Sequence, residues 1–252
     1  ESRGLGDVYK RQVSKSKEYV GNSGFINRWT KKLVNISKCE IMNEEINLLR
    51  DQTKGKLKGM SQFSLRVGVK KDSYLIQPVI EKLNILSGQK HYFENFKNRN
   101  VRISSPSFFQ VNISQAEKLG DLISKIASLS GKETVIDAFA GVGTFSLLIS
   151  NKVKKIYAIE SSYSSIEDAK INLKNLTNVE LIQNEVENLT EENFKEKIDV
   201  IILDPSRKGV HSNALNWVLK LSPPQIIYVS CNIESLKKDL IGLKKYYEIN
   251  KI

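Results

Sequence analysis

The sequence predicts an α/β protein, in which a doubly wound parallel sheet follows a smaller α+β domain. Short β-branched and apolar runs alternate with helix-like segments through the second half of the chain, and parallel neighbours need such crossover connections. Two capping boxes, Ser114–Glu117 and Ser164–Glu167, predict the starts of two of these helices. The predicted strands of the sheet are Thr134–Ala138, Lys155–Ile159, Val179–Ile182, Val200–Leu203 and Ile226–Val229.

Composition limits the classes of protein to consider. The chain has 252 residues, of which 40% are hydrophobic, so it can bury a core in one large or two modest domains. Its net charge of +11 favours a polyanionic partner such as RNA, although a solvated lysine-rich surface is the alternative. No run of about eighteen uncharged apolar residues predicts a membrane span, and no signal peptide is apparent.

Cysteine and histidine usage indicates the compartment. The two cysteines, Cys39 and Cys231, lie far apart, and neither has metal-ligand spacing to the two histidines. A disulfide framework is therefore not expected, and a reducing, cytoplasmic setting is.

Three segments are expected along the chain. Residues 1–12 lack periodicity and resemble translated adapter sequence, so we expect a non-native or disordered leader there. Residues 13–94 form a central α+β region whose many lysines and arginines predict an RNA-facing surface, or else solvated strand edges. Residues 95–252 carry the parallel sheet. The central region is expected to contain a hairpin over 20–34, a helix-like stripe over 39–49 and strands over 62–69 and 73–79.

A glycine loop follows the first strand of the predicted sheet, at Asp137–Thr144. Gly141 and Gly143 let the backbone approach a ligand closely, but the third glycine of a dinucleotide fingerprint is missing, which counts against NAD. Glu160 ends the second strand, where a carboxylate can accept hydrogen bonds from both hydroxyls of a ribose. This combination favours S-adenosylmethionine over a dinucleotide.

Two further strand ends carry candidate residues. Asp204 opens the segment Asp-Pro-Ser-Arg-Lys-Gly after the fourth strand, where Arg207 can meet phosphate or base edges; a helix-capping aspartate before a rigid turn is the alternative. Cys231 follows the fifth strand and is a candidate nucleophile beside a bound cofactor, with inert packing as the alternative.

The segment 108–112 (Phe-Phe-Gln-Val-Asn) precedes the sheet and combines two aromatic with two amide side chains. An aromatic ring can stack on a flipped base, and an amide can hold the edge of a pyrimidine or a cofactor. A core aromatic pair is the alternative for Phe108 and Phe109.

Together, in this order and spacing, residues 107–112, the 137–145 loop, residues 204–209 and Ser230-Cys231-Asn232 resemble the RNA (uracil-5-)-methyltransferase family. They are most similar to its 23S ribosomal RNA branch. The resemblance implies a class I methyltransferase fold, S-adenosylmethionine as cofactor and RNA as substrate, with ribosomal RNA expected over transfer RNA. A monomer without a membrane partner is expected as well.

The resemblance further implies roles for single residues. Cys231 falls on the nucleophile that adds to C6 of uracil, so that C5 accepts the methyl group and 5-methyluridine results. Residues on cofactor- or base-binding positions are Gln110, Phe139, Gly141, Gly143, Thr144, Glu160, Glu185 and Asp204. Residues on substrate-binding positions are Phe108, Asn112, Asp204, Arg207 and Asn232.

The chain departs from the family pattern at several points. Ile233 follows Asn232 where the family has proline, and Thr144 stands where relatives often have asparagine. We expect a fragment shortened at both ends, without the last strands of the sheet and without the general-base glutamate. Cys39 resembles the fourth ligand of an iron–sulfur cluster that full-length relatives hold, so a cluster is expected only in a full-length protein.

Two other functions remain open from the sequence. One is a class I RNA methyltransferase that modifies an adenine or guanine amine, which needs no cysteine nucleophile and usually carries an Asn/Asp-Pro-Pro-Tyr signature. The other is a non-catalytic RNA-binding fragment that keeps the fold as a scaffold.

Overall fold

A computed structural model describes residues 9–13, 23–68, 73–110 and 112–252. The chain divides into two compact units. The first extends to Pro106 and also takes in residues 110–116, and the second comprises residues 107–109 and 117–252. The predicted boundary after residue 94 falls inside a strand of the first unit, so the division lies later than expected.

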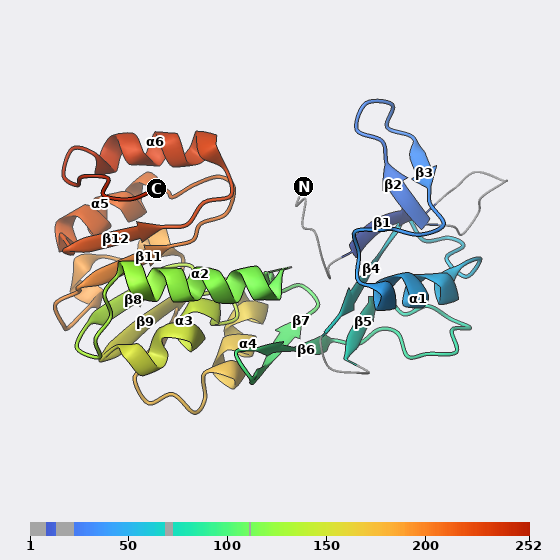
Figure 1. The fold of residues 1–252 in the computed structure, drawn as a ribbon, viewed down its shortest axis with the longest axis horizontal. Coiled ribbons are helices and arrows are strands. Elements are labelled where there is room, and N and C mark those ends of the chain that lie inside the picture. Colours follow the sequence, from blue (N-terminus) through green and yellow to red (C-terminus); the bar gives the residue numbers. More distant parts are fainter. Residues whose placement is uncertain (1–8, 14–22, 69–72, 111) are drawn as a thin grey trace. The chain divides into compact units, whose positions relative to one another are not determined.

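The second unit contains the predicted parallel sheet, and the α/β fold class is confirmed (Figure 1). Its strand order is β10-β9-β8-β11-β12, and all four pairings are parallel. The order reverses between β8 and β11, and the crevice beyond the carboxyl ends of the strands at such a reversal is where open sheets bind ligands. The strands are β8 (Thr134–Asp137), β9 (Lys155–Glu160), β10 (Val179–Gln183), β11 (Val200–Leu203) and β12 (Gln225–Tyr228).

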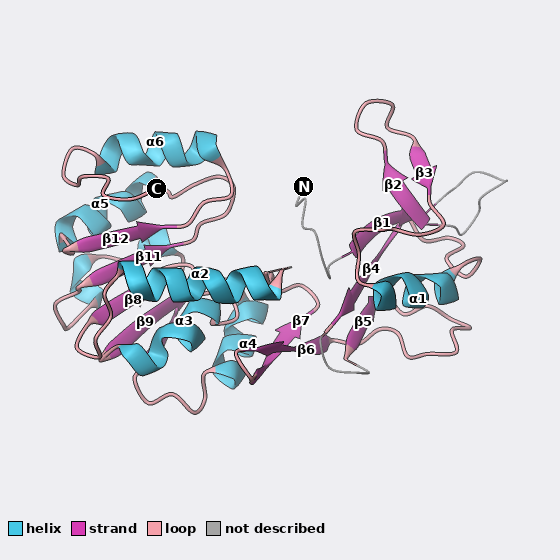
Figure 2. Cartoon of the chain, viewed as in Figure 1, coloured by secondary structure: helices cyan, strands magenta, loops and turns pink. Residues whose placement is uncertain are grey.

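Helices connect these strands, as Figure 2 shows. Two of them begin earlier than the capping boxes predict. Asn112, not Ser114, accepts the hydrogen bond of the Gln115 amide before α2, and α4 begins at Tyr163. The helices are α2 (Ile113–Ile126), α3 (Thr144–Ile149), α4 (Tyr163–Asn172), α5 (Ser212–Leu221) and α6 (Ile233–Leu243), with 3-10 turns η1 (Ser150–Lys152), η2 (Val186–Asn188) and η3 (Glu191–Asn193).

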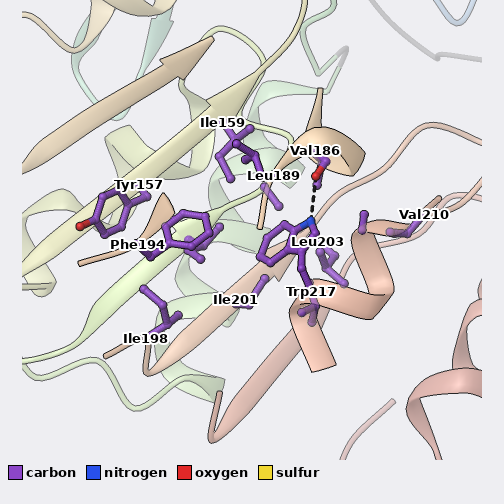
Figure 3. Packing of buried hydrophobic residues seen from close by; sticks show 14 residues of the cluster. Tyr157, Ile159, Val186, Leu189, Phe194, Ile198, Ile201, Leu203, Val210 and Trp217 are labelled. Atoms are coloured by element: carbon purple, nitrogen blue, oxygen red, sulfur yellow. Dashed lines mark hydrogen bonds between the residues drawn. The ribbon is translucent and has the colours of Figure 1, made fainter. Parts of the chain in front are cut away.

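Alternate residues of the strands enter two hydrophobic clusters, one on each face of the sheet. Along β9, Ile156 belongs to the cluster with α2 and α3, whereas Tyr157 belongs to the cluster with α5. In the second cluster Phe194 meets the edge of the Tyr157 ring, and the indole nitrogen of Trp217 donates to the Val186 carbonyl at 2.8 Å (Figure 3). Both faces of the sheet are therefore covered, as a parallel sheet requires.

The first unit holds an antiparallel sheet in the order β3-β2-β1-β4-β5. The predicted hairpin and the two later strands are confirmed where they fall on described residues; the expected turn at residues 70–72 lies outside them. The elements are β1 (Tyr9–Val13), β2 (Ser23–Ile26), β3 (Leu33–Asn35), α1 (Glu44–Thr53), β4 (Gln62–Val67), β5 (Tyr74–Gln77), β6 (His91–Phe96) and β7 (Arg99–Ser104).

Two features of the first unit correct the sequence analysis. Tyr9–Val13 form strand β1, which pairs with β2 and β4, so the expected disordered leader over residues 1–12 does not hold from Tyr9 onwards. The second is the β6–β7 hairpin, which the sequence analysis did not predict. Its alternate residues in β6 are buried, which is the two-residue period of a strand. Within the described residues no helix is long and apolar enough to cross a bilayer.

Candidate functional site

The glycine loop after β8 presents bare backbone at the carboxyl end of the sheet. Gly143 has a φ of 92°, and a Cβ there would lie 2.9 Å from the Leu173 side chain, so both conformation and packing select glycine. Gly141 has a φ of 57°, and no atom lies within 4 Å of the position that its Cβ would take. A ligand can therefore approach the backbone at Gly141 without displacing a side chain.

Glu160 ends β9 and is fixed beside this loop. One carboxylate oxygen, Oε2, accepts a hydrogen bond from the Gly141 amide at 2.9 Å. The other, Oε1, accepts from the Ser162 amide at 2.7 Å. The side chain is partly exposed, and each oxygen keeps a lone pair for a further donor. The sequence predicted the place of Glu160 but not its hydrogen bond to the glycine loop.

Two aspartates complete a cluster of carboxylates with Glu160. Asp137 is fully buried; its Oδ2 accepts from the amide and the hydroxyl of Ser146, while its Oδ1 has no partner among the described residues. Burial raises the pKa of Asp137 to about 6, and the charge of Glu160 adds to the effect. Burial and the charge of Asp137 likewise raise the pKa of Asp204 to about 7. Three carboxylates thus share the edge formed by the ends of β8, β9 and β11.

The lone cysteine of this unit lies in the loop that follows β12. Cys231 is exposed. The next residue, Asn232, accepts from the Glu234 amide at the start of α6 and donates from its Nδ2 to the Arg207 carbonyl at 2.9 Å. The Cys231 loop is therefore joined directly to the loop that carries Asp204, and the two ends of β11 and β12 are neighbours in the sheet.

Asp239 on α6 makes a second connection, between the loop after β11 and the end of β12. Its Oδ2 accepts from the Val210 amide at 2.7 Å and from the Tyr228 hydroxyl at 2.6 Å, and the side chain is buried. A Cβ at Gly209 would lie 2.5 Å from the same oxygen, so the loop passes closely over Asp239. Burial and the neighbouring Asp239 raise the pKa of Tyr228, which keeps its hydroxyl a proton donor.

Sequence reasoning missed Asp137, Ser146 and Asp239. For Asp239 a signal existed, because it lies four residues before Leu243 on the buried face of an amphipathic helix. A buried carboxylate on such a face requires hydrogen-bond donors, and these are the Val210 amide and the Tyr228 hydroxyl.

The segment before the sheet contributes to two different environments. Phe109 is buried, as the core alternative predicts, whereas Phe108 is 64% exposed. Ser107 donates to Asp168 on α4 at 2.7 Å, which fixes this end of the segment to the second unit. Gln110 and Asn112 belong to the first unit, and the side-chain oxygen of Asn112 caps α2.

The other predicted cofactor residues occupy the same edge of the sheet with less defined contacts. Phe139 is half-buried and packs against the α5-side cluster, and Thr144 is the first residue of α3. Glu185 is exposed just after β10, whose end meets the end of β9 through the bond from the Asn184 amide to the Glu160 carbonyl.

Cys39 lies in the first unit, away from any group of metal ligands among the described residues. It is buried just before α1, and its backbone amide and carbonyl both bond to the Asn47 side chain. No group of three or more histidine, cysteine, aspartate or glutamate side chains that could hold a metal ion occurs in the described part of the chain. The role of Cys39 as a cluster ligand in a full-length protein therefore stays a prediction.

Known proteins resemble the chain in both sequence and fold. An RNA methyltransferase of Clostridium tetani is 39% identical over 175 residues, covering 68% of this chain and 38% of the relative. One of Clostridium acetobutylicum is 40% identical over 176 residues, with the same coverage of 68% and 38%. The chain thus spans about two fifths of the length of these relatives.

A solved structure extends the likeness to almost the whole chain. It is the Pyrococcus abyssi tRNA (uracil-54, C5)-methyltransferase in complex with S-adenosyl-L-homocysteine, with a TM-score of 0.78 over 98% of this chain and 71% of that chain. The two are 20% identical, so this likeness concerns the fold, which is that of class I methyltransferases. The family model for tRNA (uracil-5-)-methyltransferases matches residues 79–252, well over half of the sequence. The chain belongs to the RNA (uracil-5-)-methyltransferase family.

Proposed function

We propose that the protein methylates C5 of a uridine in RNA, with S-adenosylmethionine as methyl donor and Cys231 as nucleophile. The observation that carries the proposal is that Asn232 joins the exposed Cys231 loop to the Asp204 loop, while Asp239 joins the Asp204 loop to the end of β12, just before Cys231. A covalent nucleophile has to be held at a fixed place beside the group that binds the base or the cofactor.

The carboxylate cluster fits this cofactor. S-adenosylmethionine carries positive charge on its sulfonium and its α-amino group, and an ionised carboxylate at short range favours such a charge. Oδ1 of Asp137 has no hydrogen-bond partner among the described residues, and burial together with the charge of Asp137 raises the pKa of Asp204 to about 7. Glu160 would hold the ribose hydroxyls at the open glycine loop. Gln110, Phe139, Thr144 and Glu185 are proposed cofactor- or base-binding residues.

The chemistry assigned to the chain begins at Cys231. When bound, S-adenosylmethionine supplies an electrophilic methyl group. The Cys231 thiolate forms a bond to C6 of the uracil ring, and the electron pair of the C5–C6 double bond becomes available at C5. After methylation a base removes the C5 proton, the double bond reforms and the thiolate leaves C6. Asp204 would engage the uracil edge during these steps.

The target uridine must leave its stack to reach Cys231, which costs least in a loop or a bulge. We propose ribosomal RNA as the substrate, because residues 107–112 resemble the ribosomal branch of the family. The matched family model and the Pyrococcus abyssi enzyme are both named for tRNA, so a tRNA hairpin is the comparison substrate.

The test is mass spectrometry of the protein after incubation with S-adenosylmethionine and an RNA hairpin that carries 5-fluorouridine. Fluorine at C5 cannot leave as a proton, so a cysteine that has attacked C6 stays attached. We expect an adduct with the parent chain and with Cys39→Ala, which removes the buried thiol, and none with Cys231→Ala. Methylated RNA without any adduct would point to an amine-directed enzyme and would contradict the proposal.

A further inference from the structure

The tip of the β2–β3 hairpin is a preformed loop. The strands pair with Ile26 opposite Leu33, which leaves residues 27–32 as the connection. Asn27 organises this loop: its amide donates to the Lys32 carbonyl and its carbonyl accepts from the Lys31 amide, both at 2.9 Å. Its side-chain oxygen also accepts from the amides of Trp29 and Thr30, both at 2.9 Å. The loop therefore holds its shape through its own hydrogen bonds.

This loop presents an aromatic ring to solvent. Trp29 is 84% exposed, whereas the other tryptophan of the chain, Trp217, is 3% exposed and has its indole nitrogen bonded. The cross-strand pair of Phe25 and Val34 is also exposed, so apolar side chains are exposed both at the tip and further along the hairpin. Exposed apolar side chains that gather in one patch can mark a binding site.

The charges around the ring all have one sign. Arg28, Lys31 and Lys32 are exposed and, within the described residues, take part in no ion pair. No aspartate or glutamate occurs between residues 23 and 38. Lys38, by contrast, is paired with Glu40 and Glu44.

From these observations we propose that the loop 27–32 binds single-stranded RNA, with a base stacked on Trp29 and phosphates paired with Arg28, Lys31 and Lys32. Aromatic platforms beside cationic grooves bind unpaired strands in this way, largely without sequence preference. Tryptophan and arginine are common in protein interfaces as well, but lysine is depleted there, so the two lysines favour RNA over a protein partner. The proposal rests on RNA as the substrate of the proposed function and adds a contact to a part of that RNA outside the target uridine.

Trp29 also supplies the measurement. We expect titration with a single-stranded oligouridine to quench the tryptophan fluorescence of the parent chain, because only the exposed ring can stack on a base. Trp29→Ala should abolish this quenching and weaken binding by about tenfold, within the range of about 5- to 140-fold per stacked base. Trp29→Phe should restore most of the affinity. Leu48→Ala, which trims another exposed apolar residue of this unit, is the matched control and should bind as the parent does.

The cations are tested by salt dependence. Replacing Arg28, Lys31 and Lys32 by alanine should reduce the slope of log affinity against log salt by about 2, because each phosphate contact on a single strand contributes about 0.7. Unchanged RNA affinity in Trp29→Ala would overturn the proposal. So would a sedimentation result in which Trp29→Ala abolishes a dimer of the parent chain while RNA affinity stays the same. The 5-fluorouridine adduct is measured in a separate experiment. If RNA binding depends on Trp29 but no adduct forms, the proposed function is refuted and RNA binding by the loop 27–32 is not.

Discussion

At the scale of single residues, the carboxylates at the sheet edge carry an electrostatic cost. Folding raises the pKa of Asp204 from 3.8 to about 7, chiefly through burial. The folded state therefore binds more protons than the unfolded chain between these two pH values, and this group's contribution to stability falls as the pH rises through that window. Asp137, with its pKa raised to about 6, acts in the same direction, and the two groups titrate as a pair.

This cost yields a prediction for Asp204→Asn. At pH 8 the variant lacks a buried charge, so its free energy of unfolding without cofactor should exceed that of the parent by on the order of 1 kcal/mol. Affinity for S-adenosylmethionine, measured by calorimetry, should instead rise with pH. In the parent it should increase about tenfold between pH 5.5 and 7.5 as the carboxylates ionise, and in the variant it should increase much less.

Two controls accompany this measurement. Glu192→Gln neutralises an exposed carboxylate on η3 and should leave both trends as in the parent. An equally steep rise of cofactor affinity with pH in Asp204→Asn would show that the cluster does not meet the charge of the cofactor.

At the scale of elements, α6 fixes the positions of two loops at once. Its first residue follows the cap Asn232, and its buried Asp239 accepts hydrogen bonds from the loop after β11 and from the end of β12. A helix that begins two residues after Cys231, the proposed nucleophile, and reaches back to the neighbouring loop sets the distance between Cys231 and Asp204. Asp239 is thus a positioning residue.

Asp239→Ala should separate the two loops. The Val210 amide and the Tyr228 hydroxyl would lose their acceptor, which costs roughly 2 to 3 kcal/mol in urea unfolding. The rate of adduct formation with 5-fluorouridine RNA should fall at least about tenfold, with affinity for S-adenosylhomocysteine changed less than about threefold.

Conservative and neighbouring changes complete this test. Asp239→Asn keeps one acceptor oxygen and should recover part of the rate, and Lys238→Ala alters an exposed neighbour and should have no effect. A parallel loss of adduct rate and cofactor affinity in Asp239→Ala would indicate general destabilisation in place of positioning.

The elements also show what sequence patterns capture. All five parallel strands were predicted within a residue or two, because each is an apolar run between helix-like segments. Helix starts were predicted less accurately, because both capping boxes place the start too late. At α2 the local pattern does not show that the side chain of Asn112, and not that of Ser114, accepts the hydrogen bond of the Gln115 amide. The β6–β7 hairpin was missed because its alternation contains charged and amide residues, one of them the buried Glu94.

At the scale of the whole molecule, charge is distributed unevenly. The chain carries a net charge of +11, yet the edge of the sheet gathers Asp137, Glu160 and Asp204. Composition reveals the excess of lysine and arginine that suits a polyanion. It cannot reveal the acidic cluster, because these three residues are 23 (160 − 137) and 44 (204 − 160) positions apart and meet only through strand order.

The positions of the two cysteines give the folded chain a built-in chemical reporter. Cys231 is exposed in the second unit and Cys39 is buried in the first. A brief pulse of iodoacetamide should therefore alkylate Cys231 alone in native buffer, and modification of Cys39 should appear only when the first unit opens. Peptide mass spectrometry across a urea series would then give separate opening curves, one for each thiol. Equal labelling of both thiols without urea would contradict the buried position of Cys39. The same asymmetry allows one dye to be attached at the proposed uridine site without altering any other residue.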